Sequence, residues 1–484
     1  MKVNSIVEGF FYNSEKTPDK TALILGNEKI SYEEVSECIL KVAGFLKNQG
    51  VSEGDRVAFY GEKSPLFLYT YFATHLIKAI AVPLDIKLPD ERLADLISQT
   101  EPHILLHPTD ISHSFKQLPF GKNLLDAKPL KSFEFPDKDL TADILFTTGT
   151  TGSSKGVKLT HHNILAGAEN SNIFIGNNSS DTEIIPLPLH HAFGLRRLRT
   201  NMLLGATVVL VDGFIFPKLF FDAIENYGAN GICMVPAGFS IVKKLMKRTY
   251  IDYFRKLKYI EFGSSSMENS EKKDLAEALP DTRICMHYGL TEVAANIFIE
   301  FHDDDSKLNA LGKPSPNTLV KIVSDAGIEQ PTKEVGEIVV KGAVQTPGYW
   351  KKPELTNDSF INGWFKTGDL GFADEEGYIF LSGRKDDVMN IGGKKVFPGE
   401  IEEIINQHIF VKDSACISVK ESGVITGEMI KAFVVPENKE KLDLKELMSF
   451  LREKLEPYKI PSEIIFISRI PHTSSGKKQR DKLK

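Results

Sequence analysis

The chain has 484 residues, far more than one typical domain holds, so two or more packed units with a large buried core are expected. Hydrophobic residues make up 42% and charged residues 26% of the sequence, which are values of ordinary globular proteins and exclude a disordered or fibrous chain. A formal net charge of −6 gives no general attraction to phosphate backbones, so nucleic acid is not expected as a partner.

The first hundred residues alternate helix-like and strand-like segments. Ser31 and Glu34 form a capping box ahead of apolar residues at helical spacing, and Gly50 closes the predicted helix. After it, strand-like runs alternate with helical stretches in the order 56–60, about 66–80, 81–84, 91–98 and 103–107. This order is typical of βαβ units.

The same alternation continues at 206–211, 217–227, 231–235 and 269–279, which predicts a mainly parallel α/β body. From about residue 321, short strands with turn signals indicate a β-rich subdomain. We therefore predict an α/β fold with a large body, residues 1–382, and a small mobile α+β domain, residues 383–484. In the small domain helices are predicted at 398–407 and 444–455, and the junction at 382–387 is short and polar.

Cysteine usage and hydropathy indicate a cytoplasmic protein. The four cysteines are scattered without CxxC spacing, which predicts neither a zinc site nor a disulfide framework: Cys38, Cys233, Cys285 and Cys416. The start has no signal-peptide core, and no apolar run reaches the ~18 residues that span a bilayer. The phenylalanine-rich stretch 213–224 suits contact with a membrane or an apolar substrate, although core packing is the favoured interpretation.

The segment 143–164, DILFTTGTTGSSKGVKLTHHNI, reads as an apolar strand, a loop of glycine, threonine and serine, one lysine and a helix. Glycines let backbone N–H groups approach an anion, hydroxyls add donors, and the lysine adds positive charge. The loop therefore predicts a phosphate site, with a flexible surface turn as the alternative, and it lacks the Walker pattern. The candidate phosphate ligands are Thr147, Thr148, Gly149, Thr150, Thr151, Gly152 and Lys155.

This loop resembles the phosphate-binding signature of the adenylate-forming superfamily, which includes acyl-CoA synthetases, peptide-synthetase adenylation domains and firefly luciferase. Five further segments resemble that superfamily in the same order: 187–195, 261–268, 287–295, 363–371 and 383–404, followed by the terminal IPHTSSGKKQRDKLK. The resemblance implies two half-reactions. A carboxylate attacks the α-phosphate of Mg-ATP and releases pyrophosphate, and a thiol then attacks the acyl-adenylate and releases AMP.

The resemblance implies roles on the acyl and adenine sides. His191, rather than His190, matches the histidine that flanks the acyl pocket, although a histidine beside apolar residues is more often part of the core. Ser264, Ser265 and Ser266 match the segment that lies along adenine, where relatives usually carry a Gly-Ala-Pro-like sequence.

HYGLTEVAA at 287–295 resembles the YGxTE motif. The resemblance places Tyr288 and Gly289 beside adenine, gives Thr291 a contact with the α-phosphate and makes Glu292 the magnesium ligand. Magnesium prefers hard oxygen ligands, so a glutamate suits this role. The alternative for Glu292 is a solvent-facing residue at the start of a helix.

The later segments add five roles by resemblance. Asp369 would accept the ribose hydroxyls, and Arg384 would contact ribose or phosphate. Asp386 stands at the hinge of the mobile domain, and Gly393 lines the tunnel for the thiol. Lys477 is the catalytic lysine, since a cation on a glycine-preceded loop can reach negative charge as it builds in the transition state; a basic frayed tail is the alternative.

Two segments, 194–210 and 234–246, are candidate neighbours of the acyl pocket. Neither resembles the aspartate-bearing segment by which amino-acid-activating relatives hold an ammonium group, so a fatty or aromatic acid is favoured. ATP, Mg²⁺ and coenzyme A are the implied ligands. The alternatives are a ligase that loads a carrier-protein phosphopantetheine, a luciferase-like oxygenase and a nucleotide-binding protein without catalysis.

Overall fold

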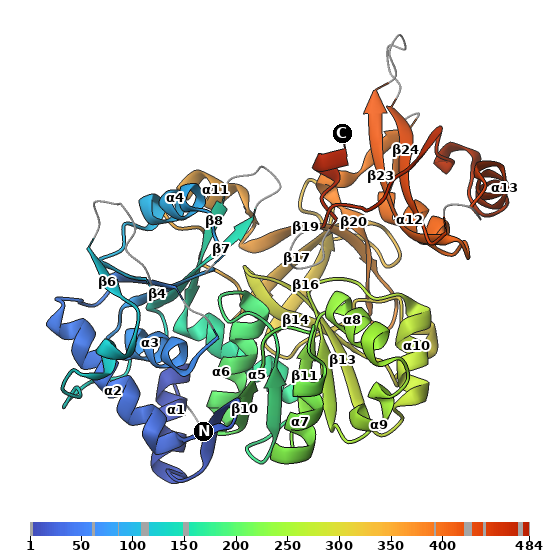
Figure 1. Cartoon of the computed structure of the whole chain (residues 1–484). Coiled ribbons are helices and arrows are strands. Elements are labelled where there is room, and N and C mark those ends of the chain that lie inside the picture. The colour runs from blue at the N-terminus through green and yellow to red at the C-terminus, as the bar shows by residue number, and fades with distance from the viewer. Residues whose placement is uncertain are drawn as a thin grey trace. The chain divides into compact units, whose positions relative to one another are not determined.

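A computed structural model describes residues 3–60, 63–85, 87–107, 116–148, 154–391, 394–420, 428–438, 442–472 and 478–483. The chain divides into two compact units (Figure 1). Unit 1 comprises Met1–Leu319 and Val340–Phe365, and unit 2 comprises Val320–Val339 and Lys366–Lys484.

The larger sheet of unit 1 has nine strands. Their order is β15 (Lys313–Pro314), β14 (Val293–Glu300), β13 (Arg283–Leu290), β12 (Tyr259–Phe262), β11 (Gly231–Met234), β9 (Thr182–Ile185), β10 (Thr207–Leu210), β1 (Thr21–Leu25) and β2 (Glu28–Ser31). The strands from β13 to β1 are parallel, whereas β2, β14 and β15 run antiparallel to their neighbours. Every residue of β10, β11 and β12 is buried, as in parallel sheets with both faces covered.

The second sheet of unit 1 has six strands in the order β6 (Gln117–Pro119), β5 (Ile104–His107), β3 (Arg56–Tyr60), β4 (Ile80–Leu84), β7 (Thr141–Thr148) and β8 (Ser154–Thr160). The first five are parallel, and β8 returns antiparallel along β7. The largest core cluster takes residues from both sheets and from five helices, so these helices fill the space between the sheets. They are α1 (Ile6–Lys16), α2 (Tyr32–Asn48), α3 (Pro65–Leu76), α5 (His161–Ile175) and α6 (Ala192–Leu204).

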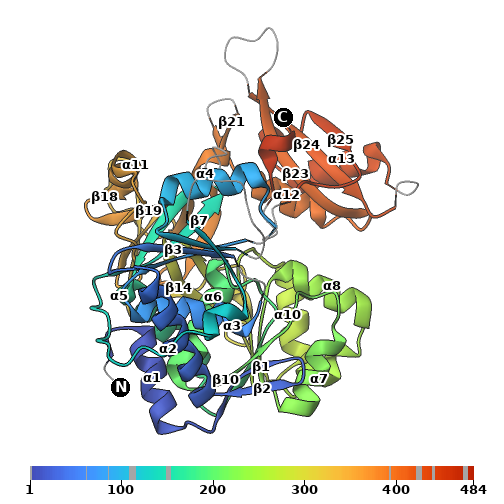
Figure 2. The same ribbon diagram turned by 60° about the vertical axis from the view of Figure 1, so that its left-hand side comes forward.

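The remaining helices of unit 1 are α4 (Asp90–Thr100), α7 (Lys218–Tyr227), α8 (Pro236–Met246), α9 (Tyr250–Phe254), α10 (Asn269–Ala278) and α11 (Pro353–Asp358). Figures 1 and 2 show α5 and α6 on one side of the nine-stranded sheet and α8 and α10 on the other. The predicted capping box of Ser31 and Glu34 is confirmed at the start of α2. The helix predicted to reach residue 80 ends at Leu76, because Lys78 adopts a φ of 64° and turns the chain into β4.

A five-stranded sheet contains β16 (Thr318–Val323), β17 (Gly336–Gly342), β19 (Trp364–Ala373) and β18 (Phe360–Ile361) in that order, with β20 (Ile379–Arg384) also paired to β19. Unit 2 holds the hairpin β21 (Met389–Ile391) and β22 (Lys394–Val396), and the sheet β23 (Val411–Lys420), β24 (Glu428–Pro436) and β25 (Glu463–Phe466). Helices α12 (Pro398–Asn406) and α13 (Leu444–Lys454) contribute to the core of unit 2 with these strands. The predicted α/β class is confirmed, whereas the boundary at residue 383 concerns which part moves and stays a prediction.

The phenylalanine-rich stretch 213–224 is only partly a core segment. Phe220 and Phe221 are buried, in agreement with the favoured interpretation, but Ile215 and Phe216 are 68% and 65% exposed. Among the described residues, no helix is long and apolar enough to cross a membrane.

A buried carboxylate holds the strand that leads into the glycine-rich loop. Asp143, on β7, lies with its Oδ1 2.9 Å from His75 Nε2, and its Oδ2 accepts hydrogen bonds from the Tyr71 hydroxyl at 3.0 Å and from Arg199 Nη2. Burial alone would raise the pKa of Asp143, but Arg199, His75 and Tyr71 bring it below its ordinary value. The carboxylate is therefore charged in the folded protein, and Arg199 on α6 balances that charge.

Replacing Asp143 by asparagine should lower the free energy of unfolding by about 3–5 kcal/mol, because it leaves Arg199 buried without a counter-charge. Urea unfolding followed by circular dichroism measures this change. Asp222→Asn, in the exposed pair of Lys218 and Asp222, is the control and should shift stability by less than about 0.5 kcal/mol. Equal losses from the two substitutions would contradict the assignment.

Candidate active site

The predicted adenine residues of unit 1 lie at the carboxyl ends of two adjacent parallel strands. Strand β12 ends at Phe262, and the segment 264–266 follows it. Strand β13 runs beside it, with Phe262 opposite Met286, and carries Tyr288 and Gly289. Ligands of open α/β sheets bind outside the carboxyl ends of the strands, so this edge is the place where a nucleotide is expected.

Thr291 and Glu292 form the turn from β13 into the antiparallel strand β14. Both residues are half-buried, as are Ser264 and Ser265 of the neighbouring segment, whereas Ser266 is exposed. The alternative that Glu292 begins a helix is therefore wrong. The tight turn between β13 and β14 places Glu292 directly before the first residue of β14.

The strands on either side of the predicted phosphate loop, β7 and β8, pair antiparallel, and we call this pair of strands the phosphate hairpin. Thr147 on β7 pairs with Lys155 on β8, and helix α5 begins only after β8, at His161. The sequence was expected to pass from the loop directly into a helix. The strand instead follows the alternation of the segment 154–160, in which Val157 and Leu159 are buried. Gly149, Thr150, Thr151, Gly152 and the side chain of Thr148 lie outside the described residues.

Tyr349 joins the phosphate hairpin to the turn that carries Glu292. The Tyr349 hydroxyl donates a hydrogen bond to Glu292 Oε1 at 2.8 Å, and Lys155 Nζ lies over the Tyr349 ring, 5.9 Å from its centroid. The backbone N–H of Thr346 donates to the Glu292 carbonyl at 2.8 Å. Lys155, a predicted phosphate ligand, thus lies over the face of the Tyr349 ring, and Glu292, the predicted metal ligand, accepts from its hydroxyl.

The prediction missed Tyr349, although a GYW triplet at 348–350 follows a predicted strand. The segment 343–349 is positioned by hydrogen bonds to its backbone carbonyls, which no sequence pattern specifies. Asn163, near the start of α5, donates to the carbonyls of Ala343 and Gln345 at 2.9 and 2.8 Å, and Lys158 N–H donates to the Gly348 carbonyl at 3.0 Å.

The donor set at Glu292 fits a magnesium ion. Among the described residues there is no cluster of three or more histidine, cysteine or acidic side chains that could hold a metal by itself. Magnesium usually takes one or two carboxylates and completes its shell with substrate phosphates and water. A single half-buried glutamate near the predicted phosphate loop fits this pattern, and its role as metal ligand stays a prediction.

The two adjacent histidines occupy different environments. His190 Nε2 lies 3.6 Å from Asp85 Oδ2, and burial together with the nearby His191 lowers the pKa of His190 to about 4. His191 is the N-cap residue of α6 and is exposed, with its ring 4.4 Å from that of His190. His190 is therefore neutral, and His191 is the more exposed of the two histidines. The role of His191 beside the acyl pocket stays a prediction.

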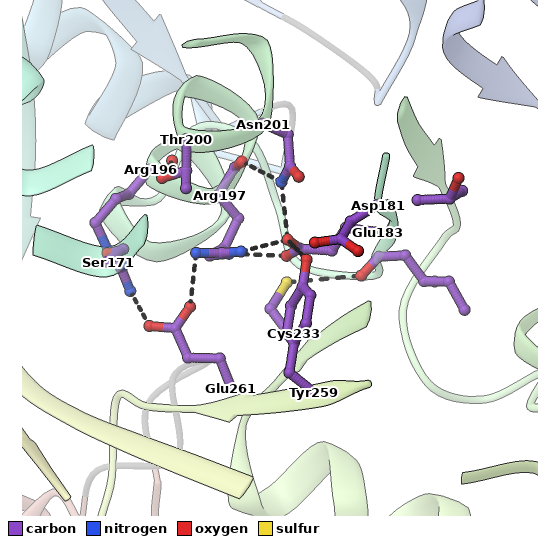
Figure 3. A network of polar contacts seen from close by, with 12 residues as sticks. Ser171, Asp181, Glu183, Arg196, Arg197, Thr200, Asn201, Cys233, Tyr259 and Glu261 are labelled. Atoms are coloured by element: carbon purple, nitrogen blue, oxygen red, sulfur yellow. Dashed lines mark hydrogen bonds and ion pairs between the residues drawn. The ribbon is translucent and has the colours of Figure 1, made fainter. Parts of the chain in front are cut away.

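Helix α6 carries buried arginines that bind carboxylates on two strands of the large sheet (Figure 3). Arg197 donates to Glu183 on β9 through Nε at 2.8 Å and also through Nη2, and its Nη1 lies 3.1 Å from Glu261 Oε2. Arg196 Nη2 donates to Glu261 Oε1 at 2.7 Å, and the Tyr259 hydroxyl donates to Glu183 at 2.7 Å. Burial alone would raise the pKa of Glu261, but Arg196 and Arg197 hold it far below its usual range.

This network changes the interpretation of the segment 194–210, which was expected to border the acyl pocket. Arg196, Arg197 and Arg199 are bound to carboxylates inside unit 1, so their charges are already compensated. One feature of the sequence does indicate these buried ion pairs. Three arginines spaced along an otherwise apolar helix require buried acidic partners, because unpaired charges are not tolerated in a core.

In unit 2, the structure brings together the predicted ribose acceptor and the predicted arginine. Asp369 on β19 pairs with Arg384 on β20, and Arg384 Nη1 donates to Asp369 Oδ1 at 2.8 Å and to the Thr367 carbonyl at 3.2 Å. Asp386, the predicted hinge, is exposed in the short 3-10 turn Lys385–Asp387. Gly393 and the predicted catalytic Lys477 lie outside the described residues.

The residues that follow Lys477 are anchored by side-chain contacts. Lys478 Nζ donates to Glu402 Oε2 at 2.9 Å, and Arg480 binds the same carboxylate at 2.8 Å and Asp387 at 3.0 Å. Glu402 lies on α12, within the core of unit 2. The alternative of a frayed basic tail is therefore wrong for residues 478–483.

Comparisons with known proteins identify the family of the chain. The model of the AMP-binding enzyme family matches residues 10–350, and the model of its C-terminal domain matches residues 400–477. The 2-succinylbenzoate–CoA ligase of Listeria monocytogenes is 29% identical over 97% of this chain and 97% of its own length. The feruloyl-CoA synthase of an Amycolatopsis species is 30% identical over 95% of this chain and 94% of its own.

Solved structures give the same result. ATP-bound MatB from Rhodopseudomonas palustris matches with a TM-score of 0.91 at 27% identity, covering 100% of this chain and 98% of that one. The o-succinylbenzoate CoA synthetase (MenE) of Bacillus subtilis, in complex with its acyl-adenylate, matches with a TM-score of 0.89 at 26% identity, covering 98% and 97%. The resemblance inferred from the motifs is thereby confirmed, and the chain belongs to the family of AMP-binding enzymes as an acid–thiol ligase of the AMP-forming kind.

Proposed function

We propose that this protein activates a carboxylic acid with ATP and then transfers the acyl group to coenzyme A. The observation that carries the proposal is the arrangement of Lys155, Tyr349 and Glu292 beside the phosphate hairpin. It sets a cation and a metal-binding carboxylate around one ring at the edge of the sheet where nucleotides are expected.

In the first half-reaction, a carboxylate oxygen of the acid attacks the α-phosphorus of ATP. The bond from that phosphorus to the bridging oxygen breaks, and pyrophosphate leaves. Thr147 and Lys155 bind the phosphates, Thr291 donates to the α-phosphate, and Glu292 would hold Mg²⁺. When bound, the metal supplies charge neutralisation at the phosphates.

In the second half-reaction, the sulfur of coenzyme A attacks the acyl carbonyl carbon, and AMP leaves. We assign Lys477 to the first step and Gly393 to the second, with residues 383–484 turning about Asp386 between the steps. Asp369 and Arg384 bind the ribose side of the nucleotide. Their mutual ion pair supports this role, since it fixes both side chains before a ligand arrives.

The acid that we propose is aromatic. The names of two relatives support this choice, because 2-succinylbenzoate and ferulate both contain an aromatic ring. The charges of Arg196, Arg197 and Arg199 are compensated, so these arginines do not offer a site for a second carboxylate. We place the enzyme in the cytoplasm, which the four free cysteines support.

A panel of aromatic, fatty and amino acids tests the function. Purified protein with Mg-ATP should release pyrophosphate fastest with aromatic acids, and addition of coenzyme A should yield the thioester and AMP. The same assay with a phosphopantetheinylated carrier protein tests the alternative acceptor, and oxygen uptake tests a luciferase-like oxygenase. Absence of acid-dependent pyrophosphate release across the whole panel would leave only a non-catalytic nucleotide-binding protein.

Replacing Lys477 by alanine should slow adenylation by about 100-fold, the scale for losing one preorganised charge-stabilising donor. Thioester formation from synthetic acyl-adenylate should persist. Lys482→Ala is the matched control, because Lys482 is an exposed lysine of the same terminus. Pyrophosphate exchange at the wild-type rate in the Lys477 variant would refute the assignment.

Replacing Tyr349 by phenylalanine should lower kcat/KM for Mg-ATP by about tenfold, because Glu292 loses a hydrogen bond to a charged group that is worth about 1.5–3 kcal/mol. KM for the acid should change little. The measurement is initial velocity at varied Mg-ATP and saturating acid. An unchanged kcat/KM would show that the hydroxyl does not orient Glu292.

A further inference from the structure

His287 precedes Tyr288 on β13, and none of the proposed steps uses it. Its side chain is only 8% exposed and contacts residues of three other elements. Its Nδ1 lies 2.9 Å from Glu261 Oε1 on β12, and its ring meets Phe193 of α6 edge-on at 4.5 Å and Phe298 of β14 at 6.0 Å. One imidazole therefore links the helix that begins at the exposed histidine to the strands of the nucleotide edge.

The same ring packs against the backbone of Gly263, which leads into the predicted adenine segment, residues 264–266. A Cβ added at Gly263 would lie 2.0 Å from Cε1 and 2.6 Å from Nε2 of His287, so the ring occupies the space beside this glycine. The next residue, Ser264, has a φ of 75°, in the left-handed region that residues with a side chain adopt at a cost. The strained turn at Ser264 is therefore packed against a side chain with little freedom to move.

Hydrogen-bond chemistry fixes the orientation of the ring. Glu261 Oε1 also accepts from Arg196 Nη2 at 2.7 Å, and the same Nη2 lies 3.2 Å from Nδ1 and 3.3 Å from Nε2 of His287. A carboxylate only accepts and a guanidinium only donates, so the neutral ring satisfies both neighbours when Nδ1 carries the proton and Nε2 accepts from Arg196. Burial and the charge of Arg196 lower the pKa of His287, although Glu261 opposes them. The ring is neutral at pH 7, with Nδ1–H directed at Glu261 and Nε2 close to Gly263.

We propose that His287 is a positioning residue for the nucleotide, which fixes segment 263–266 against β13 and thereby sets the affinity for ATP and the preference for adenine over other bases. This inference rests on the proposed function, which places adenine along Ser264, Ser265 and Ser266. A residue that served stability alone would change the melting temperature and leave base preference intact.

Nucleotide binding without acid tests the inference. Dissociation constants for ATP and for inosine triphosphate, in which oxygen replaces the 6-amino group, are measured by isothermal titration calorimetry on the full chain. His287→Leu should weaken ATP binding by about tenfold, the scale for losing a hydrogen bond to a charged group, and should lower the ATP-to-inosine-triphosphate ratio severalfold. His287→Asn, whose side-chain amide can still donate to Glu261, should recover most of both.

His161→Leu is the matched control. His161 is a fully buried histidine of unit 1, and neither of its ring nitrogens has a hydrogen-bond partner within the part of the chain that the structure describes. Its replacement should leave the ratio of the two dissociation constants unchanged. A loss of base preference in this variant equal to that in His287→Leu would overturn the proposal.

A second pair of variants tests the packing independently of the hydrogen bond. Gly263→Ala should disturb base preference as His287→Leu does, because the new methyl group displaces the ring. Combined with His287→Ala, which removes the ring, Gly263→Ala should add little further loss, since two changes at one contact are not additive. Fully additive losses would overturn the proposal, and this cycle decides the question if His287→Leu fails to fold.

The inference and the proposed function fail in different ways. If the wild-type protein binds ATP and releases pyrophosphate while every His287 and Gly263 variant keeps its base preference, the positioning role is wrong and the function stands. If the wild-type protein binds neither nucleotide, the proposed function is wrong, and the inference falls with it.

Discussion

The ion pairs between helix α6 and three carboxylates constrain the rest of unit 1. Arg199 holds Asp143 on the six-stranded sheet, and Arg196 and Arg197 hold Glu183 and Glu261 on the nine-stranded sheet. Breaking a buried pair leaves a charge without compensation, so each pair permits one relative placement of helix and strand. A single helix therefore fixes the position of the two sheets of unit 1 relative to each other.

This placement of the sheets matters because each carboxylate lies just before a segment that we assign to the active site. Asp143 leads along β7 into the phosphate hairpin, Glu183 leads along β9 toward the two adjacent histidines, and Glu261 leads along β12 into the adenine segment. Helix α6 itself begins directly after its N-cap residue, His191. A buried polar network of this kind contributes little net stability compared with apolar packing, and its value lies in the geometry that it selects. The residues of unit 1 that we propose to meet around the α-phosphate are thus positioned by charges several residues away along the chain.

The sequence predicts the α/β class, most helices and strands of the body and the order of the active-site segments, since these depend on local periodicity and on short motifs. It does not predict the strand β8 after the phosphate loop, because the alternation of Val157 and Leu159 is too short to outweigh the helical signal that follows. It also misses Tyr349, Arg196 and His287, whose contacts join residues 57, 65 and 26 positions apart. Side-chain contacts between distant segments leave no local sequence pattern. Only the run of arginines on a largely apolar helix indicates buried acidic partners.

The central claim is that a carboxylate oxygen of the acid bonds to the α-phosphorus of ATP. Isotope transfer from an acid labelled with ¹⁸O in its carboxylate tests it directly, with mass spectrometry of the nucleotide product after complete turnover with coenzyme A. The account predicts one ¹⁸O atom in AMP and none in pyrophosphate. Label in orthophosphate together with ADP, or unlabelled AMP, would contradict it.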